Sequence, residues 1–557
     1  MVRWLWVAMI NLRRAWANAL RRVFVRRVPW VQLRLRGPLP AFTPAVPWWQ
    51  RRFRGVTPPA GLDALHAAVT RIVEDPRCPG VVLKVGPVGG GWAAVREVHA
   101  EVARVRACGK RVVALLAAGD TQSWLCAIAA DDVVAPPAVS LMLPGLRREA
   151  YFLRDALRRV GVDVEVFQVS PYKSAAETLV RDDFSPENRA QLERILGARM
   201  DAMVALAAAA RKRPPETVRE WFERGILDAT SAVAAGALDA TCFEDELSAR
   251  LGGAKPATIT TWARAVRMLK TPYARVRGKR VAVVRVHGTI TSGKSRELPL
   301  PVPLLGAEQA GLESITQALR SAEQDDHVVA VVLHVDSPGG DAVASDLLWR
   351  EVARVNQAKP VVAYMHNVAA SGGYYVALPA RRIVATPDVV TGSIGVLAVR
   401  PVIAGLLRRA DVHARWLQRG DRAGLLSASQ ALSTAEKETL ERSLLHAYDL
   451  FLMRTTDGRK KDRDALEPLA GGRVWLGHEA LASGLVDETG RFCDAIRTAQ
   501  EAAHVRRDPD AHFVVEVAPS SALLPRPWPA SAIEIARELA DEVRGTVAWA
   551  VLPFGDL

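Results

Sequence analysis

The fold follows from a stretch that occurs twice, as residues 81–90, Val-Val-Leu-Lys-Val-Gly-Pro-Val-Gly-Gly, and as residues 331–340, Val-Val-Leu-His-Val-Asp-Ser-Pro-Gly-Gly. Each copy begins with a short, valine-rich run, which predicts a buried strand, and ends with two glycines, which predict a tight turn. The similarity continues on both sides at a nearly constant spacing, so that residues 30–250 resemble residues 280–500. The chain is therefore a tandem repeat.

Each copy alternates valine-rich strands with amphipathic helices. In the second copy, an apolar run at 329–335 is followed by a predicted helix at 343–356 and a predicted strand at 360–365. That alternation indicates βαβ units with buried, mostly parallel strands, and hence an α/β fold. Three further pairs of segments support the duplication: 31–37 with 282–288, 101–105 with 351–355, and 236–239 with 484–487.

The length of 557 residues exceeds what one hydrophobic core holds, so we expect more than one domain. A linker rich in basic residues opens at Gly252-Gly253 and separates the two copies. The tail contains several prolines and one amphipathic helix predicted near 531–545. The expected parts are a basic helix at 1–29, a first repeat at 30–251, a linker at 252–279, a second repeat at 280–505 and a tail at 506–557.

The first 62 residues contain many arginines and no Asp or Glu, which accounts for much of the net charge of +14. On a helix, apolar residues from Leu5 to Val23 recur at spacings of three and four, while Arg14, Arg21 and Arg22 project from the other side. The segment lacks the run of about 18 apolar residues that a transmembrane span requires. We therefore expect it to lie in the membrane interface, with its tryptophans at headgroup depth. The alternative is a packing helix with a solvated arginine face.

The composition also narrows the ligands. Nothing in the rest of the chain interleaves basic and aromatic residues along a groove, so we expect no nucleic acid partner. The five cysteines are scattered, without a CxxC motif or a Cys/His cluster. They predict small buried side chains rather than metal ligands or a disulfide framework. We expect neither a metal nor an organic cofactor.

Two loops of the second copy carry the candidate chemistry. Residues 335–341 leave a buried strand through consecutive glycines, and residues 366–373 lead from a strand to small residues around Ser371. Taken alone, such a serine is usually a helix cap. Together, the loops predict that Ser371 is a nucleophile and that the backbone N–H groups of Gly340 and Gly372 bind the oxyanion formed when it attacks a carbonyl.

A nucleophilic serine needs a base, and the candidate base lies in the first copy. Lys173 stands out in this arginine-rich chain, because a buried lysine can lose its proton near neutral pH whereas an arginine cannot. The aligned stretch of the second copy, residues 420–424, has no lysine. Conversely, the first-copy counterpart of Ser371 is Thr121 or Gln122. Neither copy looks complete by itself.

A Ser-His-Asp arrangement is the nearest chemical alternative, with His366, His334 or His287 as the base. These histidines lie in or beside predicted strands, where the alternative reading is a core residue with its hydrogen bonds satisfied. A further segment, residues 391–395, reads as a tight turn leaving a strand, and its Ser393 is an additional candidate.

Together these segments resemble the long, two-copy form of the signal peptide peptidase A (protease IV) family, which is related in fold to the Clp protease and crotonase superfamily. The resemblance covers about residues 30–500. The motifs that carry it are Asp-Ser-Pro-Gly-Gly at 336–340, Ala-Ser-Gly-Gly-Tyr-Tyr at 370–375, Thr-Gly-Ser-Ile-Gly at 391–395, Tyr-Lys-Ser-Ala at 172–175 and Arg-Asp-Asp at 181–183.

This resemblance implies a tandem repeat of two Clp protease/crotonase-like ββα-type domains. It pairs the serine of the second copy, Ser371, with the lysine of the first, Lys173, and gives Ser393 the role of helping to position that lysine. It also implies a homotetrameric bowl in the bacterial inner membrane, facing the periplasm, that degrades signal peptides left after secretory processing. The chain departs from the family at its N-terminus, where a clear membrane anchor is replaced by the basic amphipathic helix, and in its tail after 506.

Two other classes of function stay open at this point. A catalytically inactive, membrane-bound scaffold of the same fold is favoured by the eroded first copy. An acyl-CoA enzyme on the related crotonase fold would use paired glycine N–H groups to hold a thioester enolate, but its catalytic carboxylates are not apparent in the sequence.

Overall fold

The computed structural model describes residues 2–43, 60–253, 255–273, 279–302, 306–505, 514–516 and 549–550. The chain forms two compact units. Unit 1 comprises Met1–Arg147 and Leu196–Gly278, and unit 2 comprises Arg148–Ile195 and Lys279–Leu557. The segment 148–195, which belongs to the predicted first repeat, is therefore part of the same compact unit as the second repeat.

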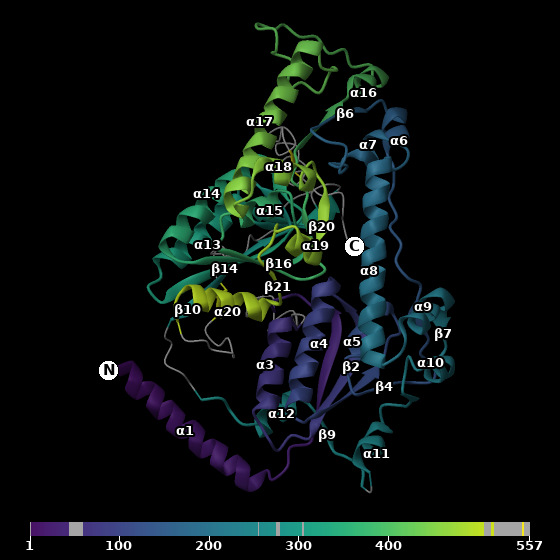
Figure 1. Ribbon diagram of the computed structural model, residues 1–557, viewed down its shortest axis with the longest axis vertical. Coiled ribbons are helices and arrows are strands. Elements are labelled where there is room, and N and C mark those ends of the chain that lie inside the picture. The colour runs from purple at the N-terminus through teal and green to yellow at the C-terminus, as the bar shows by residue number, and fades with distance from the viewer. Residues whose placement is uncertain are drawn as a thin grey trace. The chain divides into compact units, whose positions relative to one another are not determined.

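Unit 1 is built on a six-stranded sheet in the order β8-β4-β3-β2-β1-β9, with every neighbouring pair parallel. Its central strands are nearly continuous valine and leucine, because helices cover their side chains. Figure 1 shows α3 and α4 side by side against this sheet. The strands are β1 Trp30–Pro38, β2 Gly80–Gly89, β3 Arg111–Leu116, β4 Asp132–Ala135, β8 Ala240–Thr241 and β9 Ile259–Thr261, with a separate pair β5 Leu141–Leu143 and β7 Gly225–Leu227. The helices are α3 Leu62–Val73, α4 Gly91–Ala107, α5 Thr121–Ala127, α9 Pro215–Arg224, α10 Ala229–Ala235, α11 Leu247–Gly252 and α12 Trp262–Met268.

Unit 2 contains an eight-stranded sheet with the path β20-β18-β16-β14-β10-β22, to which β17 and β21 add beside β16. Its central pairs are parallel, and the edge pair of β18 with β20 is antiparallel. The strands are β10 Arg280–His287, β14 Val328–Ser337, β16 Val361–Ala370, β17 Arg382–Ala385, β18 Val390–Gly392, β20 Val474–Leu476, β21 Glu488–Thr489 and β22 Val514–Glu516. The helices are α13 Leu312–Gln324, α14 Ala342–Ala358, α15 Gly372–Ala377, α17 Thr434–Arg459, α18 Arg463–Leu466, α19 Gly477–Ala482 and α20 Phe492–Ala502, with the 3-10 turn η1 Glu467–Leu469.

The two main sheets repeat each other in register. Leu33 lies opposite Leu83 in unit 1, and Val284 lies opposite Leu333 in unit 2, as the sequence duplication requires. The ends of the copies repeat as well, because Arg211 pairs with Asp239 in one unit and Arg459 pairs with Asp487 in the other. The predicted tandem α/β repeat is confirmed.

A second sheet of unit 2 explains why residues 148–195 belong there. Strand β6 pairs antiparallel with β19, from Gln168 opposite Leu397 to Asp163 opposite Val402. An ion pair of 2.7 Å between Glu165 and Arg400 joins the same two strands. The strands of this sheet are β6 Asp163–Gln168, β11 Thr289–Thr291, β12 Arg296–Val302, β13 Gly306–Gly311, β15 Gly340–Asp341, β19 Leu397–Val402 and β23 Trp549–Ala550. The nearby helices are α6 Arg154–Arg159, α7 Glu177–Val180 and α16 Ala404–Arg409, and α8 Pro186–Arg211 contains the boundary between the units.

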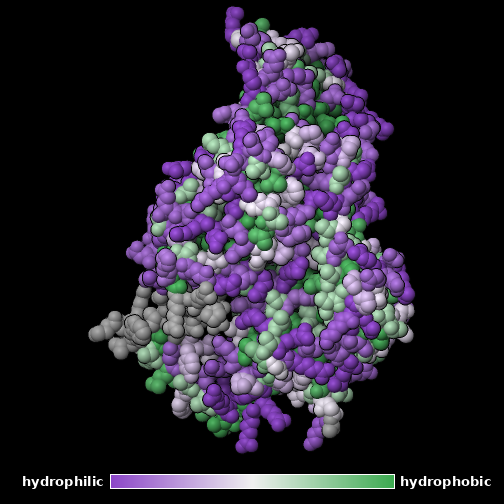
Figure 2. All heavy atoms as spheres, in the orientation of Figure 1, coloured by the Kyte–Doolittle hydropathy of each residue, from purple (hydrophilic) through white to green (hydrophobic). Residues whose placement is uncertain are grey.

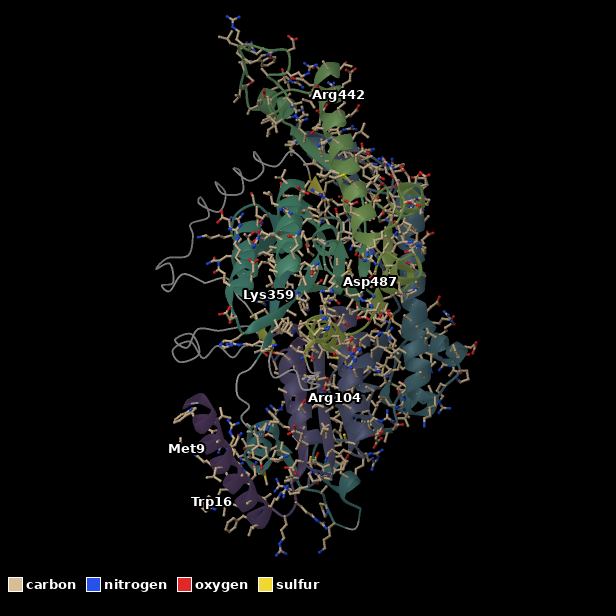
Figure 3. All side chains as sticks on the ribbon, turned by 60° about the vertical axis from the view of Figure 1, so that its left-hand side comes forward. Met9, Trp16, Arg104, Lys359, Arg442 and Asp487 are labelled. Carbon is tan, nitrogen blue, oxygen red and sulfur yellow. The ribbon has the colours of Figure 1, made fainter. Side chains whose placement is uncertain are left out.

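Helix α1, Val2–Phe24, stands where the sequence predicted the basic amphipathic helix. Its polar side contacts unit 1, since the Asn18 side chain exchanges hydrogen bonds with the backbone of Thr271 and Arg14 donates to the carbonyl of Pro272. Figure 3 shows Met9 and Trp16 on the outer side of this helix. Among the described residues, no helix is both long enough and apolar enough to span a membrane.

The predicted tail helix near 531–545 lies outside the described residues. The described part of the tail consists of β22, which pairs with β10, and β23, which pairs with β15 and β19.

Candidate active site

Ser371 lies at the sharp turn between β16 and α15. Its backbone has φ 54° and ψ −120°, a conformation that residues with a side chain rarely adopt. Two hydrogen bonds hold it there, from the Ser371 N–H to the carbonyl of Gly392 and from the Tyr375 N–H to the carbonyl of Ser371, each 2.8 Å long. Such a strained turn persists because its surroundings fix it, and positions of this kind cluster at functional sites.

The glycines after Ser371 are required by close packing. A Cβ on Gly372 would collide with Ser345 Oγ, and a Cβ on Gly373 would lie 2.5 Å from the carbonyl oxygen of Ser337. The turn carrying the serine is therefore pressed against the loop that leaves β14. This contact explains why the two predicted loops of the second copy come together.

Lys173 reaches Ser371 from the segment that β6 brings into unit 2. Its Nζ lies 2.8 Å from Ser371 Oγ, and it also lies 3.0 Å from both the carbonyl oxygen and Oγ of Ser393. Both Lys173 and Ser371 are buried. The structure thus brings together three of the residues that the sequence singled out, from two different copies.

Burial sets the protonation of the lysine. Taking the ammonium group out of water lowers the pKa of Lys173 from its ordinary value near 10.5 to about 7. A substantial fraction of Lys173 is then a neutral amine at neutral pH. An amine in this form can accept a proton from a neighbouring hydroxyl.

Ser393 is the second unusual backbone position of the site, with φ 51°. Its N–H donates to the carbonyl of Arg473 at 2.6 Å, and this bond fixes the turn. Both oxygens of Ser393 face the lysine, so they hold the amine while the third direction around Nζ points to Ser371.

The predicted oxyanion residues lie side by side. A Cβ built on Gly372 would be 3.3 Å from the backbone N of Gly340, and a Cβ on Gly340 would collide with the carbonyl of Ile290. Only glycine permits this approach at both positions. The backbones of the two glycines therefore lie close together next to Ser371, as a pair of backbone donors requires.

The three histidines of the alternative triad contact one another. His287 Nε2 lies 2.7 Å from His334 Nδ1, and the rings of His334 and His366 lie 5.1 Å apart. Burial lowers the pKa of His287 to about 3 and that of His366 to about 4. Within the described residues, no hydrogen bond joins any of them to Ser371, whose hydroxyl contacts Lys173. The geometry does not support a Ser-His-Asp arrangement.

The first copy has no serine at the corresponding position. Trp124 Nε1 donates to the carbonyl of Ala237, and Tyr374 Oη donates to the carbonyl of Leu485, so the two aromatic residues correspond. Thr121 lies three residues before Trp124, and Ser371 lies three residues before Tyr374. Of the two counterparts that the sequence left open, the structure favours Thr121, whose hydroxyl is hydrogen-bonded to Met142 O.

Sequence reasoning missed the turn Gly471-Gly472-Arg473, which contacts Lys173 closely. Its two glycines are the only signal in the sequence, and on their own they indicate no more than a turn.

Comparison with known proteins identifies the family. The sequence profile of peptidase family S49 matches residues 104–256 and 353–506, once in each copy and over more than half of the chain. The chain belongs to peptidase family S49. Membership of S49 makes it a serine peptidase, and the acyl-CoA alternative is wrong.

Relatives match most of the chain. The chloroplastic serine protease SPPA of Arabidopsis thaliana is 32% identical over 470 residues, covering 83% of this chain and 68% of its own. Protease 4 of Haemophilus influenzae is 29% identical over 459 residues, covering 79% of this chain and 73% of its own. A solved structure of a ClpP1 mutant from Listeria monocytogenes aligns with 38% of this chain and 94% of its own, at 13% identity and a TM-score of 0.25.

Proposed function

We propose that this S49 peptidase cleaves peptide bonds with a Ser-Lys dyad, in which Ser371 is the nucleophile and Lys173 the general base. The distance of 2.8 Å between Lys173 Nζ and Ser371 Oγ, both on buried residues, carries the proposal. The lowered lysine pKa of about 7 supports it, because a base must be neutral to take the serine proton.

In this mechanism, Lys173 accepts the proton of Ser371 as Oγ attacks the carbonyl carbon of the peptide. The N–H groups of Gly340 and Gly372 stabilise the resulting oxyanion, an effect worth several kcal/mol in other acyl-transfer sites. The C–N bond breaks, the lysine gives its proton to the leaving amine, and an ester remains on Ser371. Water, activated by Lys173, hydrolyses the ester and frees the serine. Ser393 keeps the amine directed at Ser371 throughout.

We propose cleaved signal peptides and other hydrophobic peptides as the substrates. A relative from Enterococcus faecium, 31% identical over 220 residues and covering 39% of this chain and 62% of its own, is named as a candidate signal peptide peptidase SppA. Ser371 is preceded in the chain by the buried residues Ala369 and Ala370 and followed by two glycines. Such surroundings suit apolar side chains of a bound peptide.

Two separate substitutions test the dyad. Ser371→Ala and Lys173→Met should each abolish peptide cleavage, measured with a fluorogenic hydrophobic peptide, while the circular dichroism spectrum stays unchanged. Lys359→Met is a matched control, because Lys359 is a partly buried lysine of unit 2 whose amine donates to the carbonyls of Ala322 and Asp325 and not to Ser371. Retained activity in either test variant would refute the dyad.

A serine-reactive fluorophosphonate separates the enzyme from the inactive scaffold. The wild-type protein should be labelled at Ser371, as peptide mapping by mass spectrometry would show. An unlabelled Ser371 in folded wild-type protein would favour the scaffold.

Membrane association is a further part of the proposal, and α1 supports it. The polar side of α1 is held by unit 1, while the apolar side is exposed, with Leu12 at 74% and Trp16 at 70% exposure. Exposed apolar residues flanked by arginines fit the interface of an anionic membrane. We place the protein at the bacterial inner membrane with the active site facing the periplasm.

Vesicle sedimentation tests this surface. The double variant Leu12→Glu and Trp16→Glu should lose binding to vesicles with anionic lipids, whereas Val343→Glu, which changes an exposed apolar residue of unit 2, should bind normally. Equal binding of both variants would contradict the proposed surface.

We also propose a homotetramer. The tandem repeat supports contacts between neighbouring chains, as follows. After α6, the first copy continues into β6, which pairs with β19. After α16, the second copy continues into an exposed stretch that contains Trp416 and Leu417. Figure 2 shows hydrophobic atoms at this end of unit 2. If the second repeat of each chain paired with the first repeat of the next chain, four chains would form a closed ring. The neighbouring chain would then cover this exposed stretch.

Light scattering tests the assembly. Leu417→Glu should reduce the measured mass below that of four chains. Leu445→Glu, at another exposed apolar residue, should leave the mass unchanged. If the wild-type protein had the mass of a single chain, the tetramer would be excluded.

A further inference from the structure

The turn Gly471-Gly472-Arg473 is tied to the turn that carries Ser393. The Gly472 N–H donates to the carbonyl of Ile394 at 2.8 Å, and the Ser393 N–H donates to the carbonyl of Arg473 at 2.6 Å. These two backbone hydrogen bonds make the pair of turns one rigid element. Lys173 contacts both turns.

Gly472 lies directly against the backbone of Lys173. A Cβ at this position would be 2.6 Å from Lys173 N and 2.8 Å from Lys173 Cα. The backbone of Gly472 also has φ 84°, in the region that favours glycine. On the other turn, a Cβ on Gly395 would be 3.4 Å from Lys173 Cδ. Two glycines therefore allow backbone to pack closely against the lysine, which is buried.

Arg473 holds the residue before the lysine. Its guanidinium carbon lies 3.9 Å from the centre of the Tyr172 ring, a cation–π geometry. Because Tyr172 and Lys173 are adjacent, fixing the ring also fixes the backbone from which the lysine side chain projects.

The first copy provides an internal comparison. Strand β7 pairs antiparallel with β5, as β20 pairs antiparallel with β18, so β7 corresponds to β20. In the register set by the matching pairs Arg211–Asp239 and Arg459–Asp487, Arg224 and Gly225 stand where the second copy has Gly472 and Arg473. In the first copy Arg224 is the last residue of α9, and Gly225, with φ 70°, follows it. The glycine at this position thus occurs in the copy that receives a lysine.

We propose that Gly472 and Arg473 are positioning residues for Lys173, which keep its amine dry and directed at Ser371. The proposal rests on the proposed dyad and adds to it the element that prepares the base. Gly472 acts by close backbone contact, and Arg473 acts through Tyr172.

Gly472→Ala tests the contact, with Gly484→Ala as its matched control. Gly484 also has a positive φ, 72°, but its Cβ would meet only the end of the Lys461 side chain. Both variants carry similar backbone strain, so both should melt at a lower temperature. Only Gly472→Ala should slow fluorophosphonate labelling of Ser371 at pH 7, by about tenfold for each unit that the lysine pKa rises. Its labelling rate should recover at higher pH.

A second pair of variants tests Arg473. Arg473→Met should shift the pH midpoint of labelling upward, and Arg473→Lys, which keeps a cation over the ring, should restore most of the wild-type profile. Lys173→Met distinguishes a failure of the dyad from a failure of the positioning role of Gly472 and Arg473. Unchanged labelling in Lys173→Met would refute the dyad itself. Loss of labelling in Lys173→Met, together with wild-type pH profiles in Gly472→Ala and Arg473→Met, would overturn the positioning proposal alone.

Discussion

Lys173 changes charge within the physiological pH range because it is buried. With a pKa of about 7, its neutral fraction falls about tenfold for each pH unit below that value. We therefore expect kcat/KM to rise with pH up to about 7 and to level off above it, since the neutral amine is the active form. Measuring kcat/KM from pH 5 to pH 9 checks this expectation. A profile that is flat, or highest below pH 6, would contradict a lysine base.

The residues of the site differ in how well the sequence alone predicts them. Small neighbouring residues made Ser371 a candidate, the rarity of lysine among many arginines made Lys173 a candidate, and the family resemblance paired them. Gly472 could not be predicted, since its role depends on contact with Lys173, far away in the chain. Tyr172 and Arg473 meet only after folding, and neither residue type indicates the stack by itself.

Three adjacent strands of unit 2 bury histidines together. His287, His334 and His366 lie on β10, β14 and β16, and burial depresses the pKa of each. The folded state thus favours neutral histidine, whereas the unfolded chain takes up protons below about pH 6.5. Stability is present above that pH and is lost as the pH falls toward 4, by up to about 1.4 kcal/mol per unit for each histidine.

We predict that the free energy of unfolding falls steeply between pH 7 and pH 5. His366→Phe should reduce the slope of this fall, because it removes one proton-binding group. Urea denaturation at several pH values measures both slopes. Equal slopes in the wild type and the variant would show that His366 does not contribute.

At the level of elements, the strand and helix pattern was predictable because buried parallel strands read as valine-rich runs. The pairing of β6 with β19 was not, since both strands are short and come from different copies. That pairing carries Lys173 into unit 2, so it decides where the site forms.

At the scale of the whole chain, the boundaries of the two units determine how cleavage of the polypeptide affects activity. A break in the linker at 252–279 puts Lys173 and Ser371 on two different pieces of the chain, although both residues belong to unit 2. We predict that a chain nicked at a protease site inserted at residue 254 stays active while its two pieces remain bound. Each piece purified alone from denaturant should be inactive, and mixing them should restore activity. Activity in either isolated piece would contradict a site shared by the copies.

The shared site has an evolutionary consequence. A duplicated enzyme with two full sites can lose either copy and remain an enzyme. This chain has Lys173 in one copy and Ser371 in the other, and Thr121 at the first-copy position that corresponds to Ser371. Under the proposed dyad, each copy is indispensable to the other. The duplication can be undone only by a chain that first regains the missing serine or the missing lysine.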